Sequence, residues 1–138
     1  MKMNENLKKR ILFVDDEPMV LKGLQRTLRK MRGAWDMAFA SSAQEALAIL
    51  DNNPMDVIIS DMKMPEMSGF ELLRSIKKEH PDTGVIIMIN YGDTYTVKDA
   101  LLLGADEYIT KPFKSFEVSL IVERAYWRIL SESGAPSE

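Results

Sequence analysis

Residues 57–69 read VIISDMKMPEMSG. The apolar run at the start of this stretch is the pattern of a β-strand covered on both faces, and it leads to Asp61 at its carboxyl end. A proline and a glycine mark the loop that follows. Ser68, with Glu71 three residues later, has the spacing of a capping box, so a helix is expected to begin there. The stretch predicts a buried strand, an acidic group at its end, and a helix behind a short loop.

The same alternation continues in both directions along the chain. Short runs rich in valine, isoleucine and phenylalanine predict strands at residues 11–14, 35–40, 55–59, 85–89 and 107–110. Apolar residues at helical spacing predict helices at residues 20–33, 43–52, 69–80, 96–103 and 116–130. Ser42 with Glu45 repeats the capping-box spacing, and Gly104 is placed to end the fourth helix in a left-handed conformation. Five strand-then-helix units indicate an α/β fold with a parallel sheet, right-handed crossovers and helices on both faces.

Composition limits the functions open to the chain. Its 138 residues suffice for one ordinary domain, expected at 10–130, between an N-terminal extension at 1–9 and a polar tail or linker start at 131–138. A net charge of −3 argues against direct binding of nucleic acid. With no cysteine and a single histidine, His80, a metal site would need oxygen ligands. The sequence has neither an apolar run long enough for a membrane span nor a secretory signal, so the cytoplasm is the expected compartment.

Polar and charged side chains follow four of the five predicted strands. They are Asp15, Asp16, Glu17, Asp61, Asn90 and Lys111. Because ligand sites in open parallel sheets lie at the carboxyl ends of the strands, these groups are expected to converge there. Clustered carboxylates repel one another unless a cation sits between them, and Mg²⁺ prefers oxygen ligands. Lys111 adds a fixed positive charge, and Asp61 is then well placed to attack phosphorus.

Each of these groups also has a purely structural interpretation. Acidic residues at the start of a helix stabilise its positive end, which would account for Asp15, Asp16 and Glu17. Asp61 could be an ordinary loop residue, and Lys111 a solvated charge. The joint occurrence at three strand ends is what favours a functional site.

The chain resembles the receiver domains of two-component response regulators from about Arg10 to Leu130. The likeness is carried by three stretches, ILFVDDEP from Ile11, VIISDMKMPEMSG from Val57, and GADEYITKPF from Gly104. It implies a flavodoxin-like, doubly wound sheet of five parallel strands in the order 2-1-3-4-5, with five helices. It also implies a phosphoryl donor that is a histidine kinase or a phosphotransfer protein. Such a domain takes up and loses its own phosphoryl group and is not a turnover enzyme.

The resemblance assigns roles at the predicted site. It implies that Asp61 is the phosphoacceptor and that Asp16 and Asp61 bind Mg²⁺ directly, together with the backbone carbonyl of Lys63. Asp15 would bind the ion through water. These assignments follow from the family pattern and give each carboxylate a distinct task.

The same resemblance covers the fifth strand. Lys111 would contact the phosphoryl oxygens, and the peptide bond between Lys111 and Pro112 is expected to be cis. Tyr108 falls at the position of the switch aromatic, which changes rotamer when a receiver is phosphorylated. A half-buried strand tyrosine is its ordinary alternative.

One position departs from the family pattern. Where most receivers carry threonine or serine at the end of the fourth strand, this chain has Ile89, followed by Asn90. Ile89 has no hydroxyl to donate to a phosphoryl group, and that hydrogen bond normally couples phosphate to the switch aromatic. Either Asp61 is phosphorylated and Asn90 supplies a substitute amide donor, or Asn90 narrows access and the domain is a phosphorylation-independent docking module. The charged groups needed for the transfer all remain, which favours phosphorylation.

Surface and class alternatives complete the expectations. Residues 101–103 are three leucines, too wide an arc of the fourth helix for all to face the sheet, so one is expected to face out. Receivers commonly form dimers or output contacts through the fourth helix, fifth strand and fifth helix, so Leu102 is a candidate for such an interface, although a single exposed leucine is equally ordinary. A phosphatase using an aspartyl phosphate would need an acid where Lys63 lies. A flavodoxin-like electron carrier would need a phosphate-binding loop where Asp15 would repel phosphate.

Overall fold

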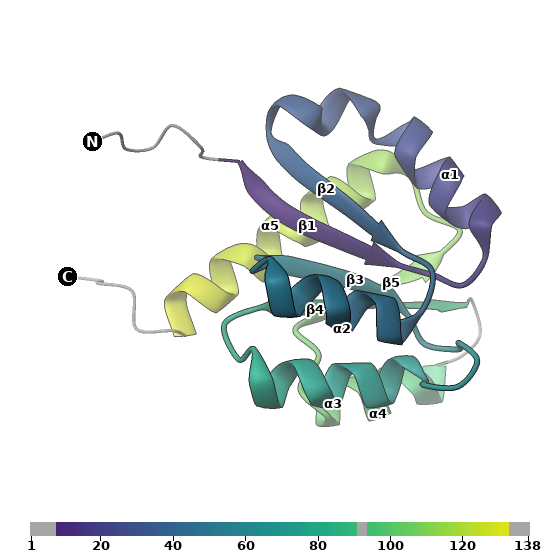
Figure 1. Ribbon diagram of the computed structural model, residues 1–138, viewed down its shortest axis with the longest axis vertical. Coiled ribbons are helices and arrows are strands. Elements are labelled where there is room, and N and C mark those ends of the chain that lie inside the picture. The colour runs from purple at the N-terminus through teal and green to yellow at the C-terminus, as the bar shows by residue number, and fades with distance from the viewer. Residues whose placement is uncertain (1–7, 91–93, 133–138) are drawn as a thin grey trace.

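The computed structural model describes residues 8–90 and 94–132. Five strands and five α-helices alternate, with one 3₁₀ helix after the first α-helix (Figure 1). In chain order they are β1 (Lys9–Val14), α1 (Pro18–Thr27), η1 (Arg29–Gly33), β2 (Trp35–Ala40), α2 (Ala43–Asn52), β3 (Val57–Asp61), α3 (Gly69–Glu79), β4 (Gly84–Asn90), α4 (Thr94–Leu102), β5 (Glu107–Lys111) and α5 (Ser115–Glu132). The expected tail at residues 133–138, most of the N-terminal extension (residues 1–7) and the fourth-strand terminator at residues 92–93 lie outside the described residues.

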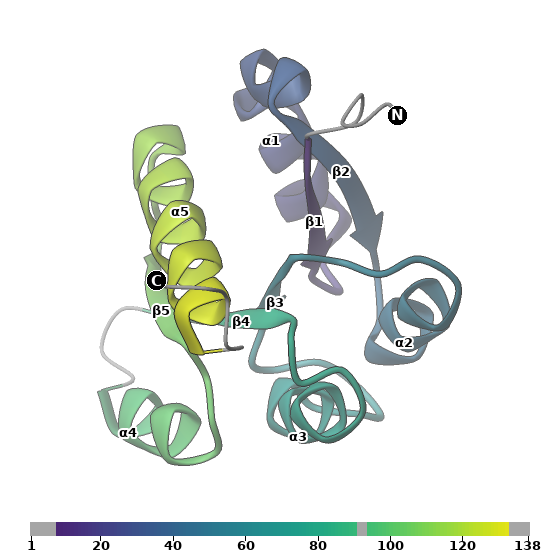
Figure 2. The same ribbon diagram turned by 90° about the vertical axis from the view of Figure 1, so that its left-hand side faces the viewer.

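The strands form one parallel sheet in the order β2-β1-β3-β4-β5, so the predicted flavodoxin-like topology is confirmed. Figure 2 shows α1 and α5 on one side of the sheet and α2, α3 and α4 on the other. The order reverses between β1 and β3, since the chain moves outward to β2 before returning past β1. In open parallel sheets this switch point lies beside the ligand site.

Two apolar clusters, one on each face, hold the helices to the sheet. Side chains of a strand alternate between faces, so Ile87 and Ile89 of β4 enter the cluster under α2, α3 and α4, while Ile86 and Met88 enter the cluster under α1 and α5. All four are at most 4% exposed. A strand buried on both faces explains the continuous apolar run that the sequence shows there.

The first helix is shorter than predicted. We expected one helix to run to Gly33, but α1 ends at Thr27 and a 3₁₀ helix covers Arg29–Gly33. Leu28 stays in the core at 1% exposure while the chain tightens, a common way for an α-helix to end. The tighter turn brings Trp35 into register with Lys9 at the start of the sheet.

Helix caps agree with the sequence signals in most respects. Ser68 and Glu71 form a complete capping box at the start of α3. Ser42 accepts a hydrogen bond from the backbone N–H of Glu45 at the start of α2, but the carboxylate of Glu45 binds Ser41 instead of returning to Ser42. The second predicted box is thus half formed. Gly104 has a φ of 106°, the left-handed conformation expected after α4.

The last two helices differ from expectation at their ends and on their surfaces. α4 begins at Thr94, two residues early, and α5 continues to Glu132, two residues past the expected end. We expected one of three consecutive leucines to face out, yet Leu101, Leu102 and Leu103 are 46%, 76% and 38% exposed. Among the described residues, no helix is long and apolar enough to cross a membrane.

Candidate functional site

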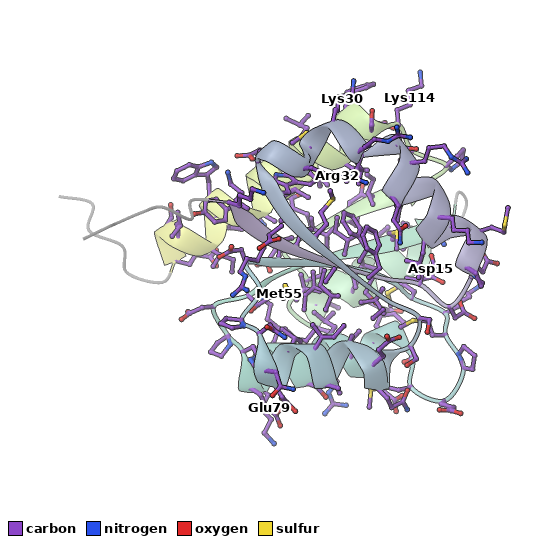
Figure 3. The ribbon with its side chains drawn as sticks, turned by 45° about the horizontal axis from the view of Figure 1, so that its top comes forward. Asp15, Lys30, Arg32, Met55, Glu79 and Lys114 are labelled. Atoms are coloured by element: carbon purple, nitrogen blue, oxygen red, sulfur yellow. The ribbon has the colours of Figure 1, made fainter. Side chains whose placement is uncertain are left out.

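Carboxylates from two strand ends meet at one edge of the sheet. Asp15 and Asp16 follow β1 and Asp61 ends β3, and one carboxylate oxygen from each lies within 4.8 Å of the others. Figure 3 labels Asp15 at the end of the sheet to which the strands of Figure 1 point. The sequence predicted this convergence, and the structure brings the three groups together.

Asp15 is fully buried, and both of its carboxylate oxygens are occupied. Oδ2 accepts a hydrogen bond from Nζ of Lys111 at 3.0 Å, and Oδ1 accepts one from the backbone N–H of Glu17 at 2.9 Å. A buried carboxylate needs such partners, because an unpaired charge away from water is costly. Asp15 is therefore held rigidly by β5 and by the start of α1.

Asp61 is held on one side only. Its Oδ1 accepts hydrogen bonds from the backbone N–H of Met62 at 3.0 Å and from Nζ of Lys111 at 3.3 Å. Burial raises the pKa of the Asp61 carboxyl; Lys111 opposes the shift, and the negative charge of Asp15 adds to it. The carboxylate of Asp61 thus sits in an environment with too little positive charge.

Lys111 bridges the two carboxylates from the far end of the sheet. Burial acts to lower the pKa of its ammonium, but the hydrogen bond to Asp15 and the attraction of Asp61 outweigh burial, so the pKa is raised. The group stays protonated and fixed at neutral pH. Three carboxylates and one ammonium leave a charge of −2, which one divalent cation would neutralise.

The donor set fits Mg²⁺. All three side chains offer carboxylate oxygens, the ligands this ion prefers. Across residues 8–90 and 94–132, Asp16 and Oδ2 of Asp61 have no hydrogen bond or ion pair, which leaves both able to bind an ion directly. The oxygens of Asp15 are already engaged, which agrees with a contact through water. The carbonyl of Lys63 as a further ligand stays a prediction.

Gly69 is a site residue that the sequence analysis treated only as a loop marker. Its backbone N–H donates to the carbonyl of Met62 at 2.9 Å, closing the loop after Asp61. A Cβ at this position would collide with the carbonyl oxygen of Asp61 and lie 2.7 Å from Cα of Met62. Only glycine lets α3 begin this close to the phosphoacceptor strand. The sequence signal was the glycine at the first position of a predicted helix, where other residues are usual.

The predicted switch positions lie on β4 and β5. Ile89 is 4% exposed and packs in the core cluster that contains Ala100 of α4, while Asn90 is exposed and in register with Lys111. Tyr108 is 41% exposed on β5. Ile89 therefore places an apolar group where a hydroxyl donor was expected. The peptide bond between Lys111 and Pro112 is cis.

Comparison with known proteins gives a consistent result. The chain matches the response regulator receiver domain family over residues 11–123. It is 37% identical over 116 residues to the regulatory protein AtoC of Escherichia coli, which covers 84% of this chain and 25% of that protein. It is 32% identical over 131 residues to the alkaline phosphatase synthesis transcriptional regulatory protein PhoP of Bacillus subtilis, which covers 95% of this chain and 53% of that protein.

Solved structures agree. A response regulator receiver domain protein from Clostridium thermocellum has a TM-score of 0.78 and 38% identity, over 87% of this chain and 95% of that one. A CheY-like receiver domain protein from Methanospirillum hungatei has a TM-score of 0.80 and 29% identity, over 91% and 98%. The chain spans about a quarter of AtoC and about half of PhoP.

Proposed function

Because the chain belongs to the response regulator receiver domain family, we propose that Asp61 accepts a phosphoryl group in a Mg²⁺-dependent reaction. The donor in this proposal is a histidine kinase or a phosphotransfer protein, and the compartment is the cytoplasm. The observation that carries the proposal is the position of Lys111, whose ammonium lies 3.3 Å from Asp61 and 3.0 Å from Asp15. A carboxylate held between a fixed ammonium and a cluster of oxygen ligands has what phosphoryl transfer needs.

The residues of the chain divide the work. The N–H of Met62 and Nζ of Lys111 orient Asp61 by holding Oδ1, so the carboxylate meets the phosphorus in a fixed position. As the bond from the carboxylate to phosphorus forms, the bond from phosphorus to the donor nitrogen breaks. Lys111 stabilises negative charge on the transferring oxygens. Asp16, Asp61 and Asp15 would hold Mg²⁺, which supplies further neutralisation of that charge.

The response to phosphorylation is the less secure half of the family mechanism in this chain. The buried apolar side chain of Ile89 favours a second function, in which the domain docks a partner without phosphorylation. A hydrogen bond contributes about 1 kcal/mol, enough to shift a switch equilibrium without abolishing the chemistry. We therefore place phosphorylation first and propose that Asn90 offers the substitute donor for coupling to Tyr108.

A partner surface on α4, β5 and α5 completes the proposal. Leu102 at 76% exposure and Tyr108 at 41% are large apolar groups open to solvent there. An output domain or a second copy of the chain would bury them. Both curated relatives are longer than this chain and are named as regulatory proteins, which supports an output domain as the partner.

Phosphorylation is tested by intact-protein mass measurement. The protein is incubated with acetyl phosphate and Mg²⁺, and a mass gain of one phosphoryl group is expected. EDTA should remove the gain, and Asp61→Asn should lack it. Asp56→Asn is the matched control, because Asp56 lies at the opposite end of β3 and binds the backbone of Arg10. If the wild-type protein gains no mass with Mg²⁺ present, the docking function replaces phosphorylation.

A further inference from the structure

Positive charge is concentrated in one segment of an otherwise acidic chain. Between Pro18 and Trp35 the sequence has five basic residues and no acidic one, while the whole chain has a net charge of −3. Such segregation creates a local positive potential although the protein as a whole is negative. The five residues are Lys22, Arg26, Arg29, Lys30 and Arg32.

These five side chains and Lys114, at the start of the fifth helix, form a surface that we name the basic face. All six are exposed. Figure 3 shows Lys30 and Lys114 projecting from the same upper edge of the molecule, with Arg32 nearby. Within the part of the chain that the structure describes, none of the six has an ion pair or a side-chain hydrogen bond. The basic face is therefore free to bind an external anion.

An apolar pocket of about 450 Å³ opens beside the basic face, between α1 and the loop that joins β5 to α5. Val20, Leu24, Phe113 and Val118 contribute apolar walls. Gly23 lies in the middle of α1, and a Cβ there would meet nothing within 4 Å. The missing side chain thus leaves room in the pocket, which is large enough for apolar side chains of a partner.

Cations adjoin this pocket on two sides. Arg26 precedes Thr27 and Arg29 follows Leu28, and both neighbours line the pocket. Lys114 lies in the loop on the other side, next to the lining residue Phe113. The arrangement is an apolar hollow with positive charges on its rim.

We propose that the basic face and its pocket bind an acidic amphipathic helix of a protein partner. A helix can insert apolar side chains into a groove while its acidic positions meet the cations around it. Duplex DNA would engage the cations but has no apolar side chains to fill the hollow. A membrane offers a flat surface and would favour projecting apolar groups over a concave pocket.

The partner would lie next to the carboxylate site. Asn90 and Lys111 line the same pocket, so a bound helix would border the place where Asp61 and its cation lie. Binding needs neither Mg²⁺ nor a phosphoryl group. The inference therefore stands apart from phosphorylation and can fail while phosphorylation succeeds.

The probe is a fluorescent helical peptide of about 18 residues, long enough to populate a helix. Leucine occupies every third and fourth position, and glutamate or alanine fills the rest. Anisotropy titration of the whole protein should show saturable binding. Raising NaCl from about 50 to about 200 mM should weaken binding several-fold, since salt screens exposed charges. A peptide with serine in place of leucine should bind about tenfold more weakly.

Three variants separate charge from pocket. Arg26→Glu with Arg29→Glu should weaken binding at least tenfold. Arg74→Glu with Lys78→Glu makes the same charge change at exposed positions of α3, on the opposite face, and should leave binding within twofold. Gly23→Leu fills the pocket without changing charge and should weaken binding about fivefold or more.

Circular dichroism must show that each variant is folded. Equal binding of the leucine and serine peptides would overturn the proposal, as would equal weakening by the two double variants. Tighter binding of a random duplex DNA or of phosphatidylglycerol vesicles, unaffected by Gly23→Leu, would also overturn it and would identify a general polyanion surface.

Discussion

Replacing Gly69 with alanine tests how closely the start of α3 controls the phosphoacceptor strand. The added Cβ would collide with the carbonyl oxygen of Asp61 and lie 2.7 Å from Cα of Met62, where ordinary contacts begin at 3.4 Å. Both obstacles are backbone atoms, so either α3 or the end of β3 must move by about 0.7 Å. Overpacking of this size costs about 1–3 kcal/mol. The movement also displaces Asp61 and should weaken binding of Mg²⁺.

Urea unfolding and an NMR titration measure the two effects. With a slope of about 2 kcal/mol per molar, typical of a small domain, the midpoint should fall by about 0.5–1.5 M urea. The Mg²⁺ concentration that half-shifts the amide signal of Met62 should rise severalfold. Gly23→Ala is the control, because its Cβ meets nothing and should stabilise α1 by about 0.5–1 kcal/mol. A Gly69→Ala protein with unchanged stability and Mg²⁺ affinity would refute the reasoning.

Four further outcomes are expected. Because the folded-state pKa of Asp61 is raised, the stability this carboxyl contributes is greatest below its ordinary value of 3.8 and is lost as pH rises through the folded pKa; in metal-free urea unfolding, the stability gap between Asp61→Asn and wild type should widen in that direction, and a gap independent of pH would contradict it. Lys111→Met leaves Asp15 and Asp61 facing each other without a cation, so acetyl phosphate should modify the variant at least tenfold more slowly by mass measurement, and an unchanged rate would exclude a role in transfer. Lys77→Met removes the partner of buried Asp106 and should cost about 1–3 kcal/mol in urea unfolding, whereas Lys78→Met, at an exposed position, should cost under about 0.5 kcal/mol; similar costs would show that the ion pair is unimportant. Ile89→Thr restores a hydroxyl, so the ring signals of Tyr108 should respond more strongly to a beryllium fluoride analogue of the phosphoryl group, and identical NMR responses in both proteins would show that position 89 does not limit coupling.

Most of the fold could be read from local patterns. Strand runs such as Val85–Ile89 are apolar because both faces are covered, and capping residues such as Ser68 act through neighbours only three residues away. The end of α1 could not be predicted, because no proline or glycine marks residue 28. What ends the helix there is tertiary, since Leu28 must stay buried while Trp35 reaches the sheet.

The site shows the same division. The rule that ligands bind at strand ends was enough to group Asp15, Asp61 and Lys111, because it depends only on strand order. The exposure of three consecutive leucines on α4 was underestimated, since periodicity cannot reveal that Ala100 alone is fully buried there. The role of Gly69 was missed because close contact between two backbones leaves little trace in side-chain patterns.

The ammonium of Lys111 reaches Asp15 across 96 positions of the chain and Asp61 across 50. A growing polypeptide on the ribosome would already carry both acids long before the base that balances them is made. Until the fifth strand docks, that end of the nascent sheet holds only mutually repelling anions. Competence for chemistry and completion of the sheet should consequently arise in a single late event, which protects the cell from half-made signalling molecules.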